Sequence, residues 1–597
     1  MNGTAVNENV VDSEPVKRRG RFPVKIAVWT LFVAALLYFL NSRFEWLNDR
    51  INLDLGVVRI ASLVLCVLTF VFWWVWLTFL SGGSRRIRLS LGVAVLILVG
   101  LFFLFNKRIL DGDMGFVRFA PRLWSSGKEL TELSADRSGN KVDLVSTSDL
   151  DFPQFLGPRR DATILNRQLK HDWTSDGPRE IWKRPVGLGW SGFVAVNNFA
   201  LTQEQRGQYE CVTCYDLSTG ELLWINQIAT RHEDTMGLGR VGPRATLSVD
   251  EGRVYAQGAT GWLQCLDGKD GSVIWKVFLP DLIGVEMVTA KNFEGLDYQF
   301  ENSPLTWGRS AAPLIFEDKI IAAAGGPTGG PFQTLIAFDK ETGEKIWTGG
   351  DSMISYGSPS VVHVLGEPQI VVMAEAQAMG FAPVDGRTLW TYGRSGSTNG
   401  DANCSQVTVV SDDQLLMSKG YTKGGELVQL SRTGDGFSVE PIWKNKRVLK
   451  TKFTNPVIHD GFAYSLSDGF LECSDVLTGQ QKWKKRGRFG HGQLLLVGND
   501  LLVQSEHGRL YLVAASPDGY QQLGEMKTID GICWNTLCLA GDYLVVRSES
   551  EMACYQLAFE SRSDELESTS TPPGSHSPTG KPGSTTEPGR QEDGGKD

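Results

Sequence analysis

An eleven-residue pattern recurs along the chain, and it constrains the fold more than any other feature. It reads CYDLSTGELLW at 214–224 and CLDGKDGSVIW at 265–275, and it returns as AFDKETGEKIW at 337–347 and CSDVLTGQQKW at 473–483. Alternating apolar positions predict a strand on each side of a turn in which Asp accepts backbone N–H groups and Gly takes a positive φ. Each copy therefore predicts a β-hairpin that is one unit of a repeat fold.

The closing position of this repeat occurs eight times. Leu523 holds the last copy, and seven tryptophans hold the others at spacings of 40–53 residues, with one longer gap of 72. A period of about 40–50 residues with four strands per unit is typical of propeller blades. Since a Trp ring is large enough to pack between neighbouring sheets, we predict structural docking by Trp182, Trp224, Trp275, Trp347, Trp390, Trp443 and Trp483.

The two ends of the repeat region complement each other. REIWKRPV at 179–186 has a closing Trp without three preceding strands, whereas 533–559 holds three strands without a closing Trp. A strand from the first segment that pairs with the second completes one blade and leaves no open sheet edge. A linear solenoid would need polar caps at both ends. We therefore predict an all-β, eight-bladed propeller over 151–559, closed by its N-terminal strand.

Three apolar runs precede the propeller region, at 24–40, 60–80 and 89–105, and they have 17–21 residues each. A transmembrane helix needs about 20 residues, with a range of about 17–25. The stretch that ends the first run, LLYFLNSRFEW, lacks the small residues of a signal-peptide cleavage site, so we expect this run to be retained. The prediction is a membrane anchor of three transmembrane helices over 24–110.

The basic residues beside these runs predict their orientation, because cytoplasmic loops are enriched in Lys and Arg. They precede the first run and fill the loop between the second and third: Lys17, Arg18, Arg19, Arg21, Arg85, Arg86 and Arg88. We therefore expect residues 1–23 to be cytoplasmic, and the propeller and C-terminus to lie on the periplasmic side of the inner membrane.

Two further segments lie outside the helices and the propeller. The sequence at 111–150 predicts a linker. Residues 560–597, rich in Ser, Thr, Pro and Gly, predict a disordered tail.

The repeated D-x-x-T/D-G-x-x-x-W resembles the tryptophan-docking motif of propellers with pyrroloquinoline quinone (PQQ)-type repeats. DFPQFLGPRRDA at 151–162 is similar to the W-P-Q-F-R-G-P-x-R-x-G segment of envelope members of that family, with Phe152 in place of Trp and Leu156 in place of Arg. The resemblance covers about 151–559. It implies the propeller fold and two possible branches, the quinoprotein dehydrogenases and the BamB-like scaffolds of outer-membrane assembly, which are not enzymes.

The dehydrogenase branch implies PQQ and calcium, an adjacent Cys–Cys disulfide over the cofactor, an Asp base, and Glu and Asn metal ligands. This chain has no adjacent Cys pair, and its propeller of about 410 residues is shorter than those enzymes. The histidines form no known ligand spacing, and no G-x-S-x-G elbow occurs. We therefore predict no catalytic residue, no metal and no cofactor. PQQ and calcium belong only to the alternative of a membrane-bound oxidoreductase.

Four cysteines occupy one repeated position, two residues before the Asp of the turn, where Ala337 and Gly380 stand in other blades. This pattern indicates a core position for a small side chain, in which Cys acts as a small hydrophobe. The four cysteines are Cys214, Cys265, Cys473 and Cys554.

The residues that begin the inner strand of each blade are expected to ring one mouth of the central channel. Aromatic rings and Arg around a concave mouth can stack on a ligand or hold a peptide carboxylate, although polar residues also line any water-filled channel. The predicted ligand-binding residues are Trp190, Arg244, Arg309, Tyr356, Asn403, Phe453, His491 and Trp534.

The gap of 72 residues contains an insertion at 279–307. Loops of this length are usually functional or disordered. We predict that this one contacts a partner through Phe293, Tyr298, Phe300 and Trp307.

A net charge of −9 argues against nucleic acid as a partner. The expected function is a membrane-anchored, extracytoplasmic scaffold for protein interactions in the cell envelope, as the BamB-like resemblance implies. The alternatives are a PQQ-dependent membrane-bound oxidoreductase and a sensor that binds a small ligand at the channel mouth.

Overall fold

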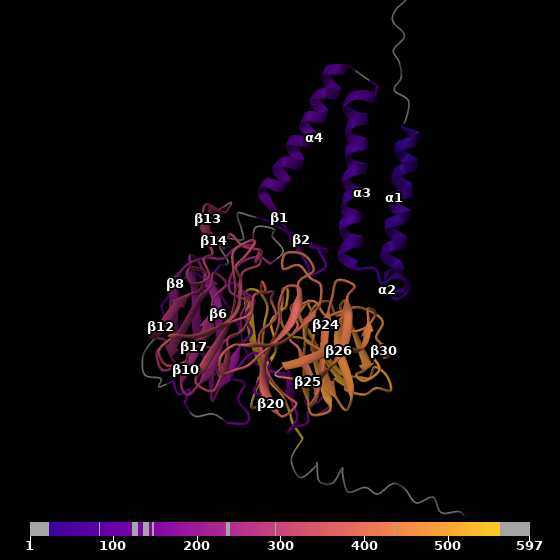
Figure 1. The fold of residues 1–597 in the computed structure, drawn as a ribbon. Helices are drawn as coiled ribbons and strands as arrows, with labels where there is room; N and C mark the ends of the chain where they lie inside the picture. The colour runs from indigo at the N-terminus through magenta and orange to yellow at the C-terminus, as the bar shows by residue number, and fades with distance from the viewer. Residues whose placement is uncertain are drawn as a thin grey trace, which may run out of the picture.

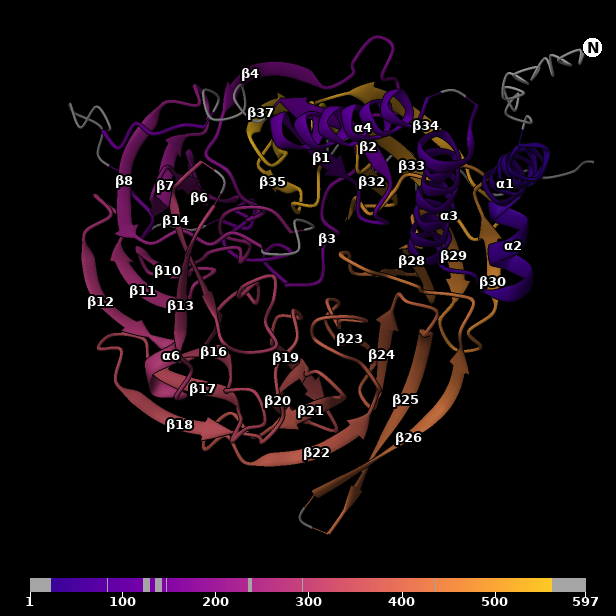
Figure 2. The same cartoon turned by 90° about the horizontal axis from the view of Figure 1, so that it is seen from above.

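Eight β-sheets form a ring, and three long helices rise from one face of it (Figures 1 and 2). The computed structural model describes residues 23–82, 84–121, 129–134, 142–145, 148–234, 239–292, 294–434 and 436–560. The predicted cytoplasmic segment 1–23 and tail 560–597 lie, apart from Pro23 and Glu560, outside the described residues.

Blades 1 to 4 follow one another along the chain, and the strands of each blade run in order from the innermost outward. Blade 1 holds β5 (Val194–Val196), β6 (Phe199–Arg206), β7 (Tyr209–Asp216) and β8 (Leu222–Ala229), and blade 2 holds β9 (Ser248–Asp250), β10 (Arg253–Gln257), β11 (Trp262–Asp267) and β12 (Val273–Phe278). Blade 3 holds β15 (Leu314–Phe316), β16 (Lys319–Gly325), β17 (Gln333–Asp339) and β18 (Lys345–Gly349), and blade 4 holds β19 (Ser360–Val364), β20 (Glu367–Met373), β21 (Gln377–Phe381) and β22 (Thr388–Gly393).

Blades 5 to 7 continue in the same order. Blade 5 holds β23 (Thr408–Ser411), β24 (Gln414–Lys419), β25 (Gly424–Thr433) and β26 (Gly436–Asn445), and blade 6 holds β27 (Val457–His459), β28 (Phe462–Ser467), β29 (Phe470–Asp475) and β30 (Gln481–Lys484). Blade 7 holds β31 (Gln493–Val497), β32 (Asp500–Gln504), β33 (Arg509–Ala514) and β34 (Gln522–Lys527).

The ring closes as predicted. Blade 8 consists of β35 (Cys538–Ala540), β36 (Tyr543–Arg547), β37 (Glu551–Gln556) and, as its outermost strand, the N-terminal β4 (Arg179–Pro185). β4 pairs antiparallel with β37, and Trp182 lies opposite Cys554. The eight-bladed propeller closed by its N-terminal strand is therefore confirmed.

The hydrophobic core lies between neighbouring blades, because both faces of each middle strand are covered. In β10, Val254, Tyr255 and Ala256 are all fully buried although successive side chains point to opposite faces. One cluster joins blades 1 and 2, and the next joins blades 2 and 3. The repeat is required because a single blade cannot cover its own two faces.

The docking tryptophans connect adjacent blades by a hydrogen bond from the indole Nε1. Asp216 first shapes the turn by accepting from the backbone N–H groups of Ser218 and Thr219, both at 2.9 Å. Trp182 then donates to the carbonyl of Leu217 in that turn at 2.9 Å. The same bond to the next blade's turn is made by Trp224, Trp275, Trp347, Trp443 and Trp483.

Trp390 is the exception among the seven. Its Nε1 donates to Oε1 of Gln369 within blade 4, at 2.7 Å. A Cβ atom added to Gly380 would lie 2.2 Å from this Nε1, so the ring lies over the glycine itself. In blade 5 the strands β25 and β26 are joined at Thr433–Gly436, without the Asp-x-x-Thr-Gly turn that receives the ring elsewhere.

The predicted small core position lies directly opposite the docking tryptophan on the neighbouring strand. Cys214, Cys265 and Cys473 pair with Trp224, Trp275 and Trp483, respectively. All four cysteines of this set are fully buried and carry no disulfide. Their role as small hydrophobes in the core is consistent with this placement.

The helices at the N-terminus match the three apolar runs. They are α1 (Val24–Ser42), α2 (Phe44–Ile51), α3 (Leu55–Val75), which continues as the π-helical turn η1 (Trp76–Leu80), and α4 (Arg85–Phe105). Three segments, Val24–Ser42, Leu55–Leu80 and Arg85–Phe105, are long and apolar enough to cross a membrane. Trp29 on α1 donates to Thr69 on α3 at 3.0 Å, which ties the first two of these segments together.

Further segments lie between the anchor and the blades. The hairpin of β1 (Asn106–Leu110) and β2 (Phe116–Pro121) follows α4, and the 279–307 insertion forms α6 (Leu279–Leu282), β13 (Met287–Lys291) and β14 (Asp297–Glu301). The stretch 111–150, predicted as a linker, thus includes β2, and its Val142 and Leu144 are buried against blades 1 and 2.

Candidate functional site

The eight predicted mouth residues all lie just before the inner strand of their blade. His491 precedes β31 by two residues, and Arg309 precedes β15 by five. The remaining members stand in the equivalent place in blades 1, 2, 4, 5, 6 and 8: Trp190, Arg244, Tyr356, Asn403, Phe453 and Trp534. All eight residues therefore stand at the same end of the inner strands.

Half of this set forms one continuous aromatic cluster across blades 1, 8, 6 and 7. The rings of Trp190 and Trp534 have centroids 4.4 Å apart, and Phe453 lies 5.2 Å from Trp534. His491 completes the row with a centroid 5.4 Å from Phe453. The mouth is therefore filled with packed rings on this side.

Arg309 and Asn403 serve the fold. Nε of Arg309 lies 2.6 Å from Glu301, and Nη1 donates to the carbonyls of Ala323 and Ala324. The Asn403 amide donates to the carbonyls of Ala374 and Glu375 at 2.8 and 3.0 Å. The Arg309 guanidinium is buried and already paired, and it holds the 279–307 insertion on blade 3.

The predicted partner-contact residues divide into two places. Tyr298 and Phe300 stack on β14 with centroids 5.9 Å apart, on the same face as their cross-strand neighbours Ala290 and Val288. Trp307 instead packs on Tyr356 at 5.3 Å and belongs to the mouth. Phe293 lies outside the described residues. The hairpin β13–β14 stands on the face of the ring from which the helices rise (Figure 1).

A turn of the anchor enters the mouth, which the sequence did not predict. Residues 111–115 join β1 to β2, and the Gly112 N–H donates to Oε1 of Glu506 in blade 7 at 2.7 Å. A Cβ atom on Gly112 would come within 2.7 Å of Phe453 and 2.8 Å of His491. Only glycine fits here, because the backbone of the turn lies directly on the aromatic cluster.

Asp113 is the centre of a buried ionic cluster in this turn. One of its carboxylate oxygens lies 2.8 Å from Nζ of Lys452 and 2.9 Å from Nε2 of His491, and Arg488 pairs with the other. Burial would raise the pKa of Asp113, but the charges of His491, Lys452 and Arg488 hold that pKa well below its usual range. The carboxylate is therefore ionised and bound by three side chains of the propeller.

Lys452 also reaches the start of the second membrane helix. Its Nζ lies 3.0 Å from Asp54, whose side chain caps α3 by accepting from the Gly56 N–H at 2.8 Å. Burial would lower the pKa of Lys452, but Asp113 and Asp54 raise it above the usual value. One lysine of blade 6 thus joins two separate parts of the anchor.

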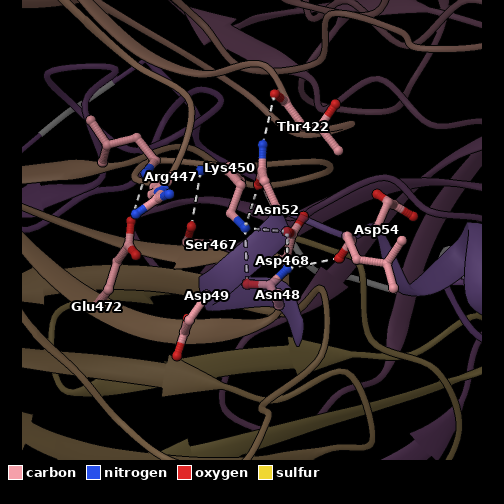
Figure 3. Close-up of polar contacts among 12 residues, drawn as sticks. Asn48, Asp49, Asn52, Asp54, Thr422, Arg447, Lys450, Ser467, Asp468 and Glu472 are labelled. Carbon is pink, nitrogen blue, oxygen red and sulfur yellow. Dashed lines mark hydrogen bonds and ion pairs between the residues drawn. The ribbon is translucent and has the colours of Figure 1, made fainter. Parts of the chain in front are cut away.

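A second group of contacts holds α2 on blade 6 (Figure 3). Lys450 pairs with Asp468 at 2.7 Å, and both side chains are almost fully buried. Asn48 of α2 fits between them, since its amide donates to Asp468 and its oxygen accepts from Lys450, each at 3.0 Å. Lys484 adds an ion pair to Asp49 at 2.7 Å.

Apolar packing accompanies these polar contacts. Phe44 of α2 stacks on Phe470 of blade 6 with centroids 6.4 Å apart and an interplanar angle of 15°. Leu55 and Val58 of α3 are buried in the same small cluster. We call all of these contacts, from Phe44 to Asp113 on the anchor side and from Lys450 to Glu506 on the propeller side, the anchor junction.

The helices gather over blades 6 to 8 and leave the face of blades 1 to 5 uncovered by helices (Figure 2).

Residues 152–164 lie inside the channel, where β3 (Thr163–Ile164) pairs in parallel with β31. Arg160 donates to the carbonyls of Ala312 and Pro359 at 3.0 and 3.1 Å, and burial lowers its pKa to about 9. The segment 151–162, which resembles the entry segment of envelope members of the family, therefore fills part of the channel and joins blades 3, 4 and 7.

One group of possible metal ligands lies at the mouth. Oxygen or nitrogen atoms of Asp111, Glu506 and His507 lie within 4.8 Å of one another. The carboxylates are already occupied, since Asp111 pairs with Arg59 at 2.6 Å and Glu506 accepts from Gly112 and from Nε1 of Trp534 at 2.7 and 2.8 Å. Asp111 and Glu506 therefore already have partners, and their contacts hold the turn at 111–115 in place.

The same geometry tests the fit of a quinone cofactor. Glu506 is an acid beside Trp534, but the space beside Phe453 and His491 contains the backbone of Gly112. The residues on this side of the mouth therefore do not fit a planar cofactor that stacks on Phe453.

A family model described as outer membrane protein assembly factor BamB matches residues 174–281 and 289–518, more than half of the chain. The chain belongs to this BamB family. A BamB from Burkholderia pseudomallei (strain K96243) is 24% identical over 372 residues, covering 56% of this chain and 87% of the relative. The BamB resemblance seen in the repeats is therefore confirmed.

Solved structures share the fold of this BamB-family propeller. A europium-containing methanol dehydrogenase has a TM-score of 0.52 at 12% identity, and the match covers 69% of this chain and 99% of the enzyme. A quinohemoprotein alcohol dehydrogenase from Pseudomonas putida HK5 has a TM-score of 0.50 at 12% identity, with coverage of 72% and 84%. At such identity the likeness shows the propeller fold alone.

Two sequence signals mark the junction in retrospect. LDGDMG at 110–115 places two acids and two glycines directly after a membrane helix, and LKTKF at 449–453 places two lysines at the start of an inner strand. Neither segment indicates which residues it contacts, because the two segments are more than 300 residues apart in the sequence.

Proposed function

We propose that this BamB-family protein is a scaffold of the cell envelope, which holds its propeller at a fixed height and orientation above the membrane for protein partners. The observation that carries the proposal is the anchor junction. A flexible tether would need only one helix and a linker, whereas here Lys450, Lys452 and Asp468 bury their charges against the anchor. Such contacts are strongly position-dependent and favour one orientation.

The direction of the helices supports the proposed topology. Segment 43–54 and the chain after Phe105 lie on the propeller side of the helices, whereas the loop at 81–84 lies at the far end (Figure 1). Arg85, Arg86 and Arg88 follow that far loop, which suits the cytoplasmic side. The propeller and its mouth would then face the periplasmic surface of the inner membrane.

The proposed partner surface is the uncovered face of blades 1 to 5, with the hairpin β13–β14 as its prominent part. Tyr298 and Phe300 are half-buried there, and aromatic residues of this kind are enriched at protein interfaces. This face points to the bilayer, so it suits envelope proteins that are themselves at the membrane. The relative from Burkholderia pseudomallei, named as an outer membrane protein assembly factor, supports a role in protein assembly.

Site-specific photo-cross-linking in cells tests this proposal. A photoreactive residue at Thr289 or Asp297, both exposed on the hairpin, should give a discrete adduct with an envelope protein. The matched control positions are Lys269 and Arg387, exposed in the turns that face away from the helices. Equal adducts from both faces, or adducts from the control face only, would contradict the proposed surface.

The oxidoreductase alternative is tested separately, by calorimetry of the full chain in detergent with PQQ and Ca²⁺. We expect no saturable binding, because the Gly112 turn occupies the space beside Phe453 and His491 in the mouth. Tight binding followed by dye reduction with an alcohol or a sugar would replace the scaffold proposal with the enzyme.

A further inference from the structure

The hairpin β1–β2 carries a patch of basic and aromatic side chains directly beneath the third membrane helix. Arg108 and Arg118 are exposed, Lys107 is half-buried, and Phe116 is 56% exposed, with Val117 and Phe119 at 39% each. We call these six residues the hairpin patch. In a water-soluble protein three adjacent exposed apolar side chains would be unfavourable, so their surroundings need an explanation.

The position of Phe119 places this patch at the edge of the hydrocarbon region. Its ring lies 4.7 Å from Phe102 and 6.2 Å from Phe103, both in the last turn of α4, and 4.6 Å from Phe116. Because a helix rises about 1.5 Å per residue, Phe102 lies roughly one turn inside the end of the span. β2 therefore lies where acyl chains meet headgroups, a depth that aromatic side chains prefer.

The three cations of the patch make no ion pair with any residue in the part of the chain that the structure describes. The acids of the same hairpin already have cationic partners, since Asp113 is held by Lys452 and Asp111 by Arg59. Basic side chains stand on both faces of the hairpin, with Arg108 beside Phe119 on one face and Lys107 and Arg118 on the other, although Lys and Arg on the periplasmic side run against the usual distribution beside membrane helices.

We propose that the hairpin patch binds anionic phospholipid headgroups in the leaflet next to the propeller. Phosphates would pair with Lys107, Arg108 and Arg118, while Phe116, Val117 and Phe119 enter the acyl boundary. The turn of the hairpin is fixed in the channel mouth, so a headgroup bound at the open end would hold the propeller close to the bilayer surface. This inference rests on the proposed membrane anchoring.

Native mass spectrometry of the full chain, released from a neutral detergent, tests the proposal. The protein is incubated with equimolar phosphatidylglycerol and phosphatidylcholine. The wild type should retain phosphatidylglycerol preferentially, and K107Q/R108Q/R118Q should lose that preference by roughly tenfold or more, because each basic residue near an anionic surface contributes a several-fold effect. R108K/R118K keeps the charge and should keep the preference.

The matched control is K269Q/K345Q/R387Q, which removes the same charge from exposed positions in or directly after the turns facing away from the helices. Its lipid preference should equal that of the wild type. An unchanged preference in K107Q/R108Q/R118Q would overturn the proposal, as would displacement of the lipid by excess inorganic phosphate, which would indicate a simple anion site.

Carbonate extraction of cell membranes tests the membrane anchoring by itself, and so distinguishes failure of the lipid-binding proposal from failure of the anchoring proposal. Wild type and K107Q/R108Q/R118Q should both resist extraction, because the three helices alone would hold the chain in the membrane. Release of the wild type would remove the anchoring proposal itself, whatever the lipid preference.

Discussion

Lys452 and Asp113 lie in two parts of the chain that the sequence alone does not relate, and they form an ion pair of 2.8 Å in the channel mouth. Both side chains are almost fully buried, and Asp54 shares the same lysine at 3.0 Å. Removal of one member of such a pair leaves an uncompensated buried charge. We therefore expect the pair to contribute strongly to the contact between the propeller and its anchor.

Lys452→Met should weaken the anchor junction by about 3–5 kcal/mol, because Asp113 and Asp54 lose their shared cation. Hydrogen exchange of peptides covering 106–121 in the full chain measures this change, and the amides of residues 111–115 should exchange faster. K269M, at an exposed turn, is the control. The double variant K452M/D113N should recover part of the loss, and unaltered exchange in K452M would show that the ion pair is unimportant.

Acid should release the same turn. The pKa of Asp113 is held well below its usual range, so the carboxylate adds stability above the unfolded-state value of about 3.9 and loses it as the pH falls through the lower folded value. Exchange of the 106–121 peptides, corrected for the intrinsic rate, should be protected at about pH 5 and lose protection only below about pH 4. In D113N this dependence should disappear, and an equal dependence in D113N would assign it to other groups.

Glu210→Gln should stabilise the propeller at alkaline pH. Burial raises the pKa of Glu210 to about 7, against the opposing effects of the Ala259 N–H and Arg244. A carboxyl with a raised folded pKa binds more protons folded than unfolded, so wild-type stability falls as the pH rises from about 4.5 to about 7, by roughly 3 kcal/mol.

Thermal unfolding followed by tryptophan fluorescence checks the Glu210 prediction. Near pH 4.5 the variant and the wild type should have similar melting temperatures, and at about pH 8 the variant should be the more stable. A constant difference between the two proteins across this range would contradict the assignment to Glu210.

Gly479→Ala should destabilise the contact between blades 5 and 6 more than Gly461→Ala destabilises blade 6. Both glycines have a positive φ, of +65° and +81°, so both substitutions strain the backbone. Only at Gly479 would the new Cβ meet a ring, 2.5 Å from Trp443, whereas nothing lies within 4 Å at Gly461. The difference in unfolding free energy should be about 1–3 kcal/mol.

Chemical denaturation of the two glycine variants and the wild type, in the same detergent, measures that difference. Equal destabilisation would mean that the turn moves away from Trp443 without loss. In that case the tryptophan would contribute through its hydrogen bond to Val476 alone.

The propeller could be predicted from the sequence because its signals are local. Each Asp-x-x-Thr-Gly turn and its closing Trp lie within eleven residues, so blade number, ring closure and the small position opposite the Trp all follow from spacing. Trp390 shows the limit of this reasoning. Trp390 holds the closing position of its repeat, yet Gly380 leaves room for the ring within its own blade and the neighbouring turn is absent.

Only the tertiary structure determines which groups fill the mouth of the central channel. The eight positions around it were predictable from strand spacing, but Arg309 is paired with Glu301, and the rings of Phe453 and His491 lie against Gly112. These partners come from an insertion and from the anchor, whose sequences contain no period that reports where they fold back. Charge pairs such as Lys452–Asp113 depend on distance in space, and spacing along the chain carries no record of it.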